Sequence, residues 1–276
     1  MSRPPQSHPA QDCLTSFFWS GDAIRSRSVS DAVMTGVVSI PAPPPRLVAD
    51  WERDISERLE SGDVDVLPLA RARVRWPDYK LCVQAVSEWT RSLGLHDVLV
   101  TSDVALMACR GAKYHHDAAH YGGAAFCNLF LSEDRGLDVH FPATGLRIPL
   151  TRGTVMVFDT GHPHAVIARH GSGFHAADFS PEQDCSQVFL TWELPIENPD
   201  VAQLLGVVFD IDPENAARLD EEQIWLNGGP ARVCPDSGRL WSDHQALQDA
   251  ARDRSHQQDQ REGHQPRGEP GADPQG

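Results

Sequence analysis

Hydrophobic residues early in the chain recur at helical spacing. In the segment RLVADWERDISERLES, four large apolar residues follow one another at intervals of four and form one stripe: Leu47, Trp51, Ile55 and Leu59. A second helix is predicted from Pro77 to Leu93, because proline suits a first helical turn and Gly94 can end the helix. We therefore expect two amphipathic helices before residue 96.

The pattern changes after His96 to short runs rich in β-branched and aromatic residues, separated by glycine and proline. The runs are DVLVTSDVALMACR, GAAFCNLFLSE, GLDVHFPA, LRIPL, GTVMVFD, HAVIARH and SQVFLTWELPI. Most have cores of about 5 to 8 residues, the length of ordinary strands. Closely spaced short strands favour a sandwich or barrel. Two helices ahead of them favour an α+β domain with helices packed on one sheet.

The two ends of the chain differ from its middle. Residues 1–38 are poorly periodic, and we treat them as an N-terminal extension. Residues 39–242 are predicted to form one folded domain, with a late helix in DPENAARLDEEQIWLN that starts at Asp212-Pro213. Residues 243–276 are rich in Gln, Gly, Pro, Asp and Arg and almost free of large apolar groups. Such a segment cannot bury enough surface to fold, so we predict a disordered tail.

A formal net charge of −15 makes the chain strongly acidic. An acidic surface repels phosphate, so neither nucleic acid nor a membrane is an expected partner. No apolar run approaches the roughly 20 residues needed to cross a bilayer, and MSRPPQSHPAQDC has no apolar signal segment. Six scattered cysteines without a CxxC pair predict buried thiols rather than a disulfide framework. We expect a cytoplasmic protein.

The stretch KYHHDAAHY, residues 113–121, concentrates side chains that bind metals. His115 and Asp117 are separated by one residue, and residues i and i+2 of a strand point to the same side. An imidazole and a carboxylate can therefore aim at one point. The alternative is a polar loop whose side chains cap the next element.

A third metal ligand is expected from a later strand. In GTVMVFDTGHPHAVIARH, a buried strand and a turn lead to His164 at the start of another strand. Two histidines and one carboxylate form the facial triad of non-haem Fe(II) oxygenases, which leaves coordination positions open. His162 is the rival ligand, and a strand-edge histidine with an ordinary hydrogen bond is the other alternative for His164.

The pair His115-x-Asp117, followed by GTVMVFDTGHPHAV, resembles the Fe(II)/2-oxoglutarate-dependent dioxygenases over about residues 98–193. The resemblance implies a double-stranded β-helix core, a jelly-roll variant, with buttressing N-terminal helices. It also implies Fe(II) bound by His115, Asp117 and His164. The implied reaction couples decarboxylation of 2-oxoglutarate with O2 to C–H oxidation, and hydroxylation is its expected form. The expected substrate is a small or amino-acid-like molecule.

One position departs from that resemblance. The family supplies an Arg or Lys near the start of the last core strand, where it binds the distal carboxylate of 2-oxoglutarate. In SQVFLTWEL that place holds Gln187. Arg169 and Arg147 are alternative anchors, although neither has the usual spacing. Asn128 matches a polar position that faces the co-substrate in the family, and Tyr121 is a second candidate.

Two other functions stay open. A cupin-like metal enzyme would use a similar barrel without 2-oxoglutarate, and the missing arginine at Gln187 is its only support. A cupin usually offers more histidines and a glutamate in its first motif, which this sequence lacks. A non-catalytic binding protein on the same fold is the other possibility, against which the complete triad speaks. Neither the substrate nor the oligomeric state can be read from the sequence, because fold does not determine function.

Overall fold

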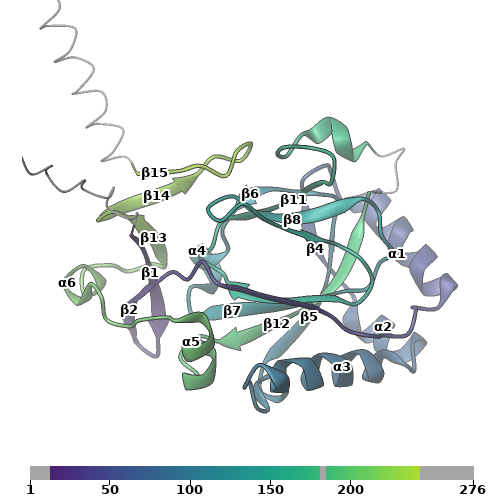
Figure 1. Ribbon diagram of the computed structural model, residues 1–276, viewed down its shortest axis with the longest axis horizontal. Helices are drawn as coiled ribbons and strands as arrows, with labels where there is room; N and C mark the ends of the chain where they lie inside the picture. The colour runs from purple at the N-terminus through teal and green to yellow at the C-terminus, as the bar shows by residue number, and fades with distance from the viewer. Residues whose placement is uncertain (1–12, 181–184, 243–276) are drawn as a thin grey trace, which may run out of the picture.

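The computed structural model describes residues 13–180 and 185–242. Its strands form three sheets, and every strand pair in them is antiparallel. Figure 1 shows two of the sheets in the middle of the molecule, helices outside them and the third sheet at one end. The mixed architecture of helices and antiparallel sheets expected from the sequence is therefore confirmed.

The largest sheet has six strands. In spatial order they are β3 (Val33–Val37), β10 (Thr154–Asp159), β7 (Ala124–Phe130), β12 (Gln187–Pro195), β5 (Asp103–Cys109) and β4 (Val64–Leu67). A second sheet, of four strands, packs against the six-stranded sheet, and apolar side chains of both sheets form a common core. Its order is β6 (Ala112–His115), β11 (His164–Ala168), β8 (Leu137–Phe141) and β9 (Leu146–Pro149). All seven predicted runs contribute strands to these two sheets, although the first run begins with a short 3-10 turn (Val98–Val100) before β5.

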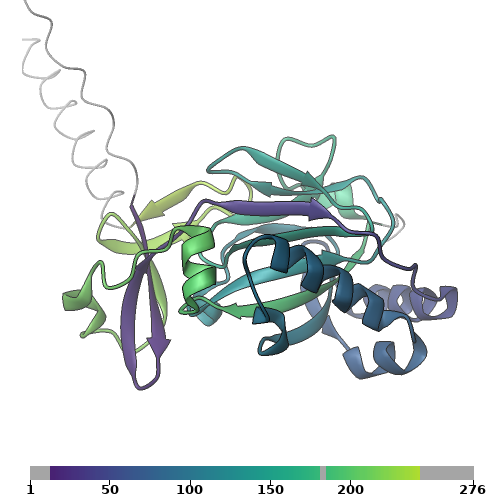
Figure 2. The ribbon, with the colours of Figure 1, turned by 60° about the horizontal axis from the view of Figure 1, so that its bottom comes forward.

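Three helices cover the outer face of the six-stranded sheet (Figure 2). They are α1 (Pro45–Arg58), α2 (Leu69–Arg75) and α3 (Tyr79–Ser92). The predicted apolar stripe of α1 is buried against this sheet, and α3 confirms the second predicted helix. Because neighbouring residues of a strand point to opposite faces, Leu190 of β12 packs in the helix-facing core, whereas Phe189 and Thr191 face the other way.

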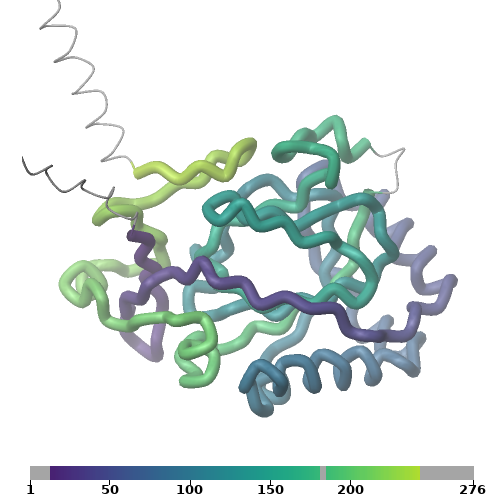
Figure 3. Tube along the Cα trace, viewed as in Figure 1, coloured from purple at the N-terminus to yellow at the C-terminus, as the bar shows by residue number. Residues whose placement is uncertain are grey.

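The third sheet joins the two ends of the described chain (Figure 3). Its order is β15 (Leu240–Ser242), β14 (Gly229–Val233), β13 (Gln223–Leu226), β1 (Leu14–Ser20) and β2 (Ala23–Ser28). Residues 1–38 were predicted to be an N-terminal extension, but β1 and β2 pair in this sheet and β3 pairs with β10. The exact domain boundary stays a prediction, and the predicted tail 243–276 lies outside the described residues.

The predicted helix at Asp212-Pro213 is only partly right. The Asp212 side chain accepts a hydrogen bond from the Asn215 backbone, as an N-cap does, but α6 (Pro213–Ala216) is short. The following QIWL segment is β13 instead, because alternate residues Ile224 and Leu226 are buried while the strand pairs with β1. The other short elements are α4 (Ala118–Tyr121), the 3-10 turn Ala176–Phe179 and α5 (Pro199–Leu205).

All six cysteines are free thiols, and four of them are buried, which confirms the expectation from their spacing. Burial raises the pKa of Cys82 and of Cys109 to about 12, so both stay protonated at neutral pH. Among the helices in the described residues, none has the length and apolar character needed to cross a membrane.

Candidate metal centre

Two neighbouring strands bring the histidines together. His115 ends β6, His164 begins β11, and the two residues are direct partners in the antiparallel pairing of these strands. Their ring centroids are 4.6 Å apart. Side chains of paired residues on one face of a sheet are neighbours, so the strand register alone places the two imidazoles side by side.

Asp117 reaches the same point from outside the strand. It lies beyond the end of β6 with φ −98° and ψ −8°, so the predicted i, i+2 geometry of a strand is not how it is positioned. Instead its backbone N–H donates to the Thr160 carbonyl at 2.8 Å. Its two carboxylate oxygens lie 3.6 Å from His115 Nε2 and 3.6 Å from His164 Nε2. One donor atom from each residue falls within 4.8 Å of the others.

Backbone carbonyls hold both imidazoles in the tautomer that a metal needs. His115 Nδ1 is 2.7 Å from the Lys113 carbonyl, and His164 Nδ1 is 3.0 Å from the His162 carbonyl. A carbonyl can only accept, so Nδ1 carries the hydrogen and donates it. The lone pair therefore stays on Nε2, which faces the carboxylate. Such a hydrogen bond to the far ring nitrogen is usual for metal-binding histidines.

Burial shapes the electrostatics of this group. Desolvation lowers the pKa of His164 well below its usual value, and the nearby His115 lowers it further. His164 is therefore neutral at neutral pH. Burial raises the pKa of the Asp117 carboxyl, because the charged form has lost water. A divalent cation among the three side chains would favour the ionised carboxylate instead.

A buried ion pair fixes the turn that leads to His164. The Arg27 guanidinium from β2 donates to both carboxylate oxygens of Asp159, at 2.7 and 2.9 Å, and both side chains are fully buried. The same carboxylate accepts from the backbone N–H groups of Ser30 and Gly161. Sequence reasoning missed Arg27, since its partner is 132 residues away and nothing local marks it.

The triad lies in the wall of a cavity of about 170 Å³. An engineered apolar cavity of about 150 Å³ binds benzene, so this one can hold a small organic ligand. Its lining includes four phenylalanines: Phe126, Phe130, Phe158 and Phe189. Asn128 and Tyr121, both predicted site residues, are in the lining as well. No Lys or Arg is part of the lining that the structure describes.

Two further polar residues of the cavity escaped the sequence analysis. Thr191 and Glu193 follow Phe189 at alternate positions of β12 and line the cavity with it. The alternation within VFLTWE was the signal that could have identified them. The side-chain oxygens Thr191 Oγ1 and Asn128 Oδ1 are buried without a hydrogen-bond partner. Burial raises the pKa of Glu193, and the charge of nearby Asp103 raises it further.

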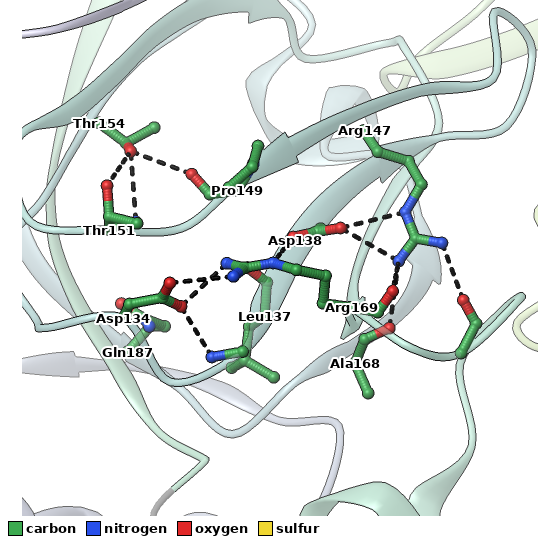
Figure 4. Close-up of polar contacts among 12 residues, drawn as sticks. Asp134, Leu137, Asp138, Arg147, Pro149, Thr151, Thr154, Ala168, Arg169 and Gln187 are labelled. Atoms are coloured by element: carbon green, nitrogen blue, oxygen red, sulfur yellow. Dashed lines mark hydrogen bonds and ion pairs between the residues drawn. The ribbon is translucent and has the colours of Figure 1, made fainter.

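The predicted anchors Gln187 and Arg169 lie outside the cavity lining. Gln187 is fully buried, and its amide nitrogen donates to the Glu133 carbonyl at 3.4 Å. The Arg169 guanidinium donates to Asp134 and Asp138 (Figure 4). Arg147, the other alternative, binds Asp138 and backbone carbonyls in the same cluster. The structure therefore brings the triad together with Asn128 and Tyr121. The three proposed anchors of the distal carboxylate lie elsewhere.

No family model and no curated protein matches the chain. Among solved structures, a prolyl-4-hydroxylase from Pseudomonas putida aligns with 59% of this chain and 92% of its own, at 19% identity and a TM-score of 0.37. A viral collagen prolyl hydroxylase from Paramecium Bursaria Chlorella virus-1, in a 2OG complex, aligns with 59% and 94%, at 11% identity and a TM-score of 0.32.

A third solved structure is the non-heme alpha ketoglutarate dependent epimerase SnoN from nogalamycin biosynthesis. It aligns with 75% of this chain and 93% of its own, at 14% identity and a TM-score of 0.34. With TM-scores of 0.32 to 0.37, these likenesses carry no weight for the activity of this chain.

Proposed function

We propose that this protein is an Fe(II)- and 2-oxoglutarate-dependent oxygenase that oxidises, and in the simplest case hydroxylates, a C–H bond of a small molecule. One observation carries the proposal. The Nε2 atoms of His115 and His164 and the carboxylate of Asp117 converge at the wall of a mostly apolar cavity. Three donors at a wall leave the cavity side of a metal open to other ligands.

The donor set fits iron. Two neutral imidazole nitrogens and one carboxylate are the ligands of the facial triad, and the hydrogen bonds to Nδ1 keep both nitrogens available. When bound, Fe(II) supplies redox chemistry with O2, and 2-oxoglutarate supplies electrons through its decarboxylation. The chain's part is to hold three donors in place and to exclude water with phenylalanine side chains.

The strand order supports a double-stranded β-helix as the core of this proposal. Successive strands from β5 to β12 are distributed between the two central sheets, as β5-β12-β7-β10 in one and β6-β11-β8-β9 in the other. We also propose that residues 39–242 are the catalytic domain, with the strands of residues 14–37 as added support. The cytoplasmic location and the absence of nucleic-acid and membrane partners stay predictions.

For 2-oxoglutarate, the cavity offers neutral hydrogen-bonding groups in place of a guanidinium. Asn128 has a side-chain amide and Tyr121 a phenolic hydroxyl, and both can donate to a carboxylate. We propose these two residues as the co-substrate contacts. Gln187 and Arg169 would need different side-chain positions to reach it, so they are the weaker assignments.

Anaerobic addition of Fe(II) and 2-oxoglutarate to purified protein tests the proposal. Chelation of iron by a 2-oxo acid gives a weak charge-transfer band in visible light. We expect this band in the wild type and in His96→Ala, whose exposed imidazole lies outside the site. We expect no band in His115→Ala. Bound iron without a band in the wild type would overturn the use of 2-oxoglutarate.

The absence of Lys and Arg from the described lining favours one alternative, a metal enzyme of cupin type that does not use 2-oxoglutarate. A non-catalytic metal-binding protein is the other. Iron retention without the band would favour both over the main proposal. Consumption of O2 with a substrate would then separate the enzyme from the binding protein.

A further inference from the structure

The carboxylate of Glu193 has no positively charged partner among the described residues. It is half-buried in the cavity lining, and none of the described residues forms an ion pair or hydrogen bond with its side chain. The same residue lines a shallow hollow outside the cavity, together with Asp103, Glu222 and His120. Glu193 and Asp103 are direct partners on β12 and β5. A negative potential therefore extends from the surface into the cavity.

Thr191 supplies an independent sign of a ligand at this place. Thr191 lines the cavity and is only 7% exposed, and its side-chain oxygen Oγ1 is buried without a hydrogen-bond partner. A buried hydroxyl that makes no hydrogen bond costs free energy. Thr191 and Glu193 lie two positions apart on one face of β12, so a single polar group of a ligand can contact both.

Aromatic rings stand beside the carboxylate. Phe126 of β7 is the direct partner of Glu193 on β12, and the Tyr121 ring meets the Phe126 ring edge-on at 5.2 Å. Both aromatic residues line the cavity. The faces of such rings attract an organic cation, whereas they give nothing to an anion. Carboxylate, hydroxyl acceptor and aromatic rings together match a protonated amine.

We propose that the substrate is an organic amine that binds as its ammonium form, with its N–H groups donating to Glu193 and Thr191 and its apolar body against the phenylalanines of the cavity. The proposal names the substrate class for the oxygenase proposed above and rests on that function. A cationic substrate would also balance the charge of a pocket that must accept a dianionic co-substrate without any lysine or arginine in its described lining.

Matched pairs of probes test the amine class by isothermal titration calorimetry on purified full-length protein. The pairs are benzylamine with benzyl alcohol, 3-phenylpropylamine with 3-phenylpropan-1-ol, and n-hexylamine with n-hexanol. We expect at least one amine to bind about tenfold more tightly than its alcohol. In Glu193→Gln this preference should disappear, because the amide keeps the shape and removes the charge. In Thr191→Val the amine should bind a few-fold more weakly.

Glu57→Gln is the control, since Glu57 is exposed on α1, away from the cavity. It should keep the preference, and the melting temperature of each variant should show that it folds. An equal affinity for amine and alcohol in all three pairs, or no binding of any amine, overturns the proposal. So does a preference that survives in Glu193→Gln. The visible band of the wild type with Fe(II) and 2-oxoglutarate is measured separately, so failure of the oxygenase function is distinguishable from failure of the amine site.

Discussion

The two ends of strand β11 are each held by arginine and aspartate, but in different surroundings. Before its first residue, His164, the turn is fixed by Arg27 and Asp159, which are fully buried. After its last residue, Arg169, whose side chain is 39% exposed, binds the exposed Asp134 and the buried Asp138 (Figure 4). The first site is one ion pair that is fully buried, whereas the second is a partly exposed cluster in which Asp138 is buried and Arg169 and Asp134 are not.

Because of this difference, the buried pair should contribute much more to stability than the partly exposed cluster. A buried carboxylate that loses its partner leaves an uncompensated charge, which is strongly destabilising. An exposed pair is solvated whether or not it forms, so it contributes little. Asp159 of the buried pair also lies on the chain shortly before His164, which lines the cavity, whereas Arg169 and its aspartates lie outside the cavity lining. Four predictions follow from the contrast, in order of decreasing effect.

Replacement of Arg27 by alanine should have the largest effect. It leaves the Asp159 charge buried without a cation, with only the backbone N–H groups of Ser30 and Gly161 as partners, and we expect a loss of about 3 to 5 kcal/mol in the free energy of unfolding. Iron affinity should fall as well, because the turn before His164 loses its support. Urea denaturation of the metal-free protein measures the first effect. Arg25→Ala is the control on the same strand, where the ion pairs are partly exposed, and a loss as large there would contradict the comparison.

Acidification should reduce the stability of the metal-free protein in two different pH ranges, one for the buried histidines and one for the aspartates bound by Arg169. Burial lowers the pKa of His116, His162 and His164 below the ordinary value of 6.5. The unfolded chain therefore binds more protons below about pH 6.5, and the metal-free protein should lose stability as the pH falls through that value. Burial lowers the pKa of His140 as well. The raised pKa values of Asp117 and Glu193 act in the opposite sense, but four histidines outnumber two carboxyls.

At the other end of β11, the hydrogen bond from Arg169 lowers the pKa of Asp134 below 3.8. The contribution of Asp134 to the free energy of unfolding is therefore fully present above pH 3.8, and it is lost only as the pH falls through the lowered pKa. Urea denaturation of wild type and of Arg169→Ala, at several pH values, separates the windows. Their difference should stay constant between about pH 7.5 and 5, while both lose stability. A wild-type stability that stays flat across this range would refute the assignment of buried neutral histidines.

Replacement of Arg169 by alanine should cost about 1 kcal/mol or less. Asp138, which is buried, keeps Arg147 as a partner at 3.1 Å, so no carboxylate is left buried and unpaired. Thermal or urea denaturation measures this loss. A loss comparable to that of Arg27→Ala would show that the surface cluster has a larger role than its exposure indicates.

The smallest expected effect is on the co-substrate. In Arg169→Ala the visible band with Fe(II) and 2-oxoglutarate should form at the same 2-oxoglutarate concentration as in the wild type, because the guanidinium lies outside the cavity lining. Asn128→Leu is the comparison that should require more 2-oxoglutarate. A band that needs more 2-oxoglutarate in Arg169→Ala would restore Arg169 as the anchor.

Local pattern predicted part of this site well. The identities of His115, Asp117 and His164 could be found because two of them are near neighbours and the third follows a recognisable strand and turn. Asn128 and Tyr121 were predicted to face the co-substrate, and both line the cavity, although their contact with 2-oxoglutarate stays a prediction. Gln187, at the start of β12, is fully buried opposite Cys109 and lies outside the cavity lining, so its contact with 2-oxoglutarate stays a prediction. Alternation along β12 groups Glu193 with Phe189 and Thr191, but only the structure shows that this face of the strand meets the cavity.

The sequence by itself determined the amphipathic helices, the succession of short strands and the candidate metal-binding side chains, since each was read from a short local pattern. Only the tertiary structure decided that β6 and β11 pair with His115 opposite His164, that Arg27 supports the turn, and which face of β12 meets the cavity. These features depend on hydrogen-bond register and burial between distant segments. The free energy of such a contact depends on both segments together, so it cannot be read from the sequence of either segment alone.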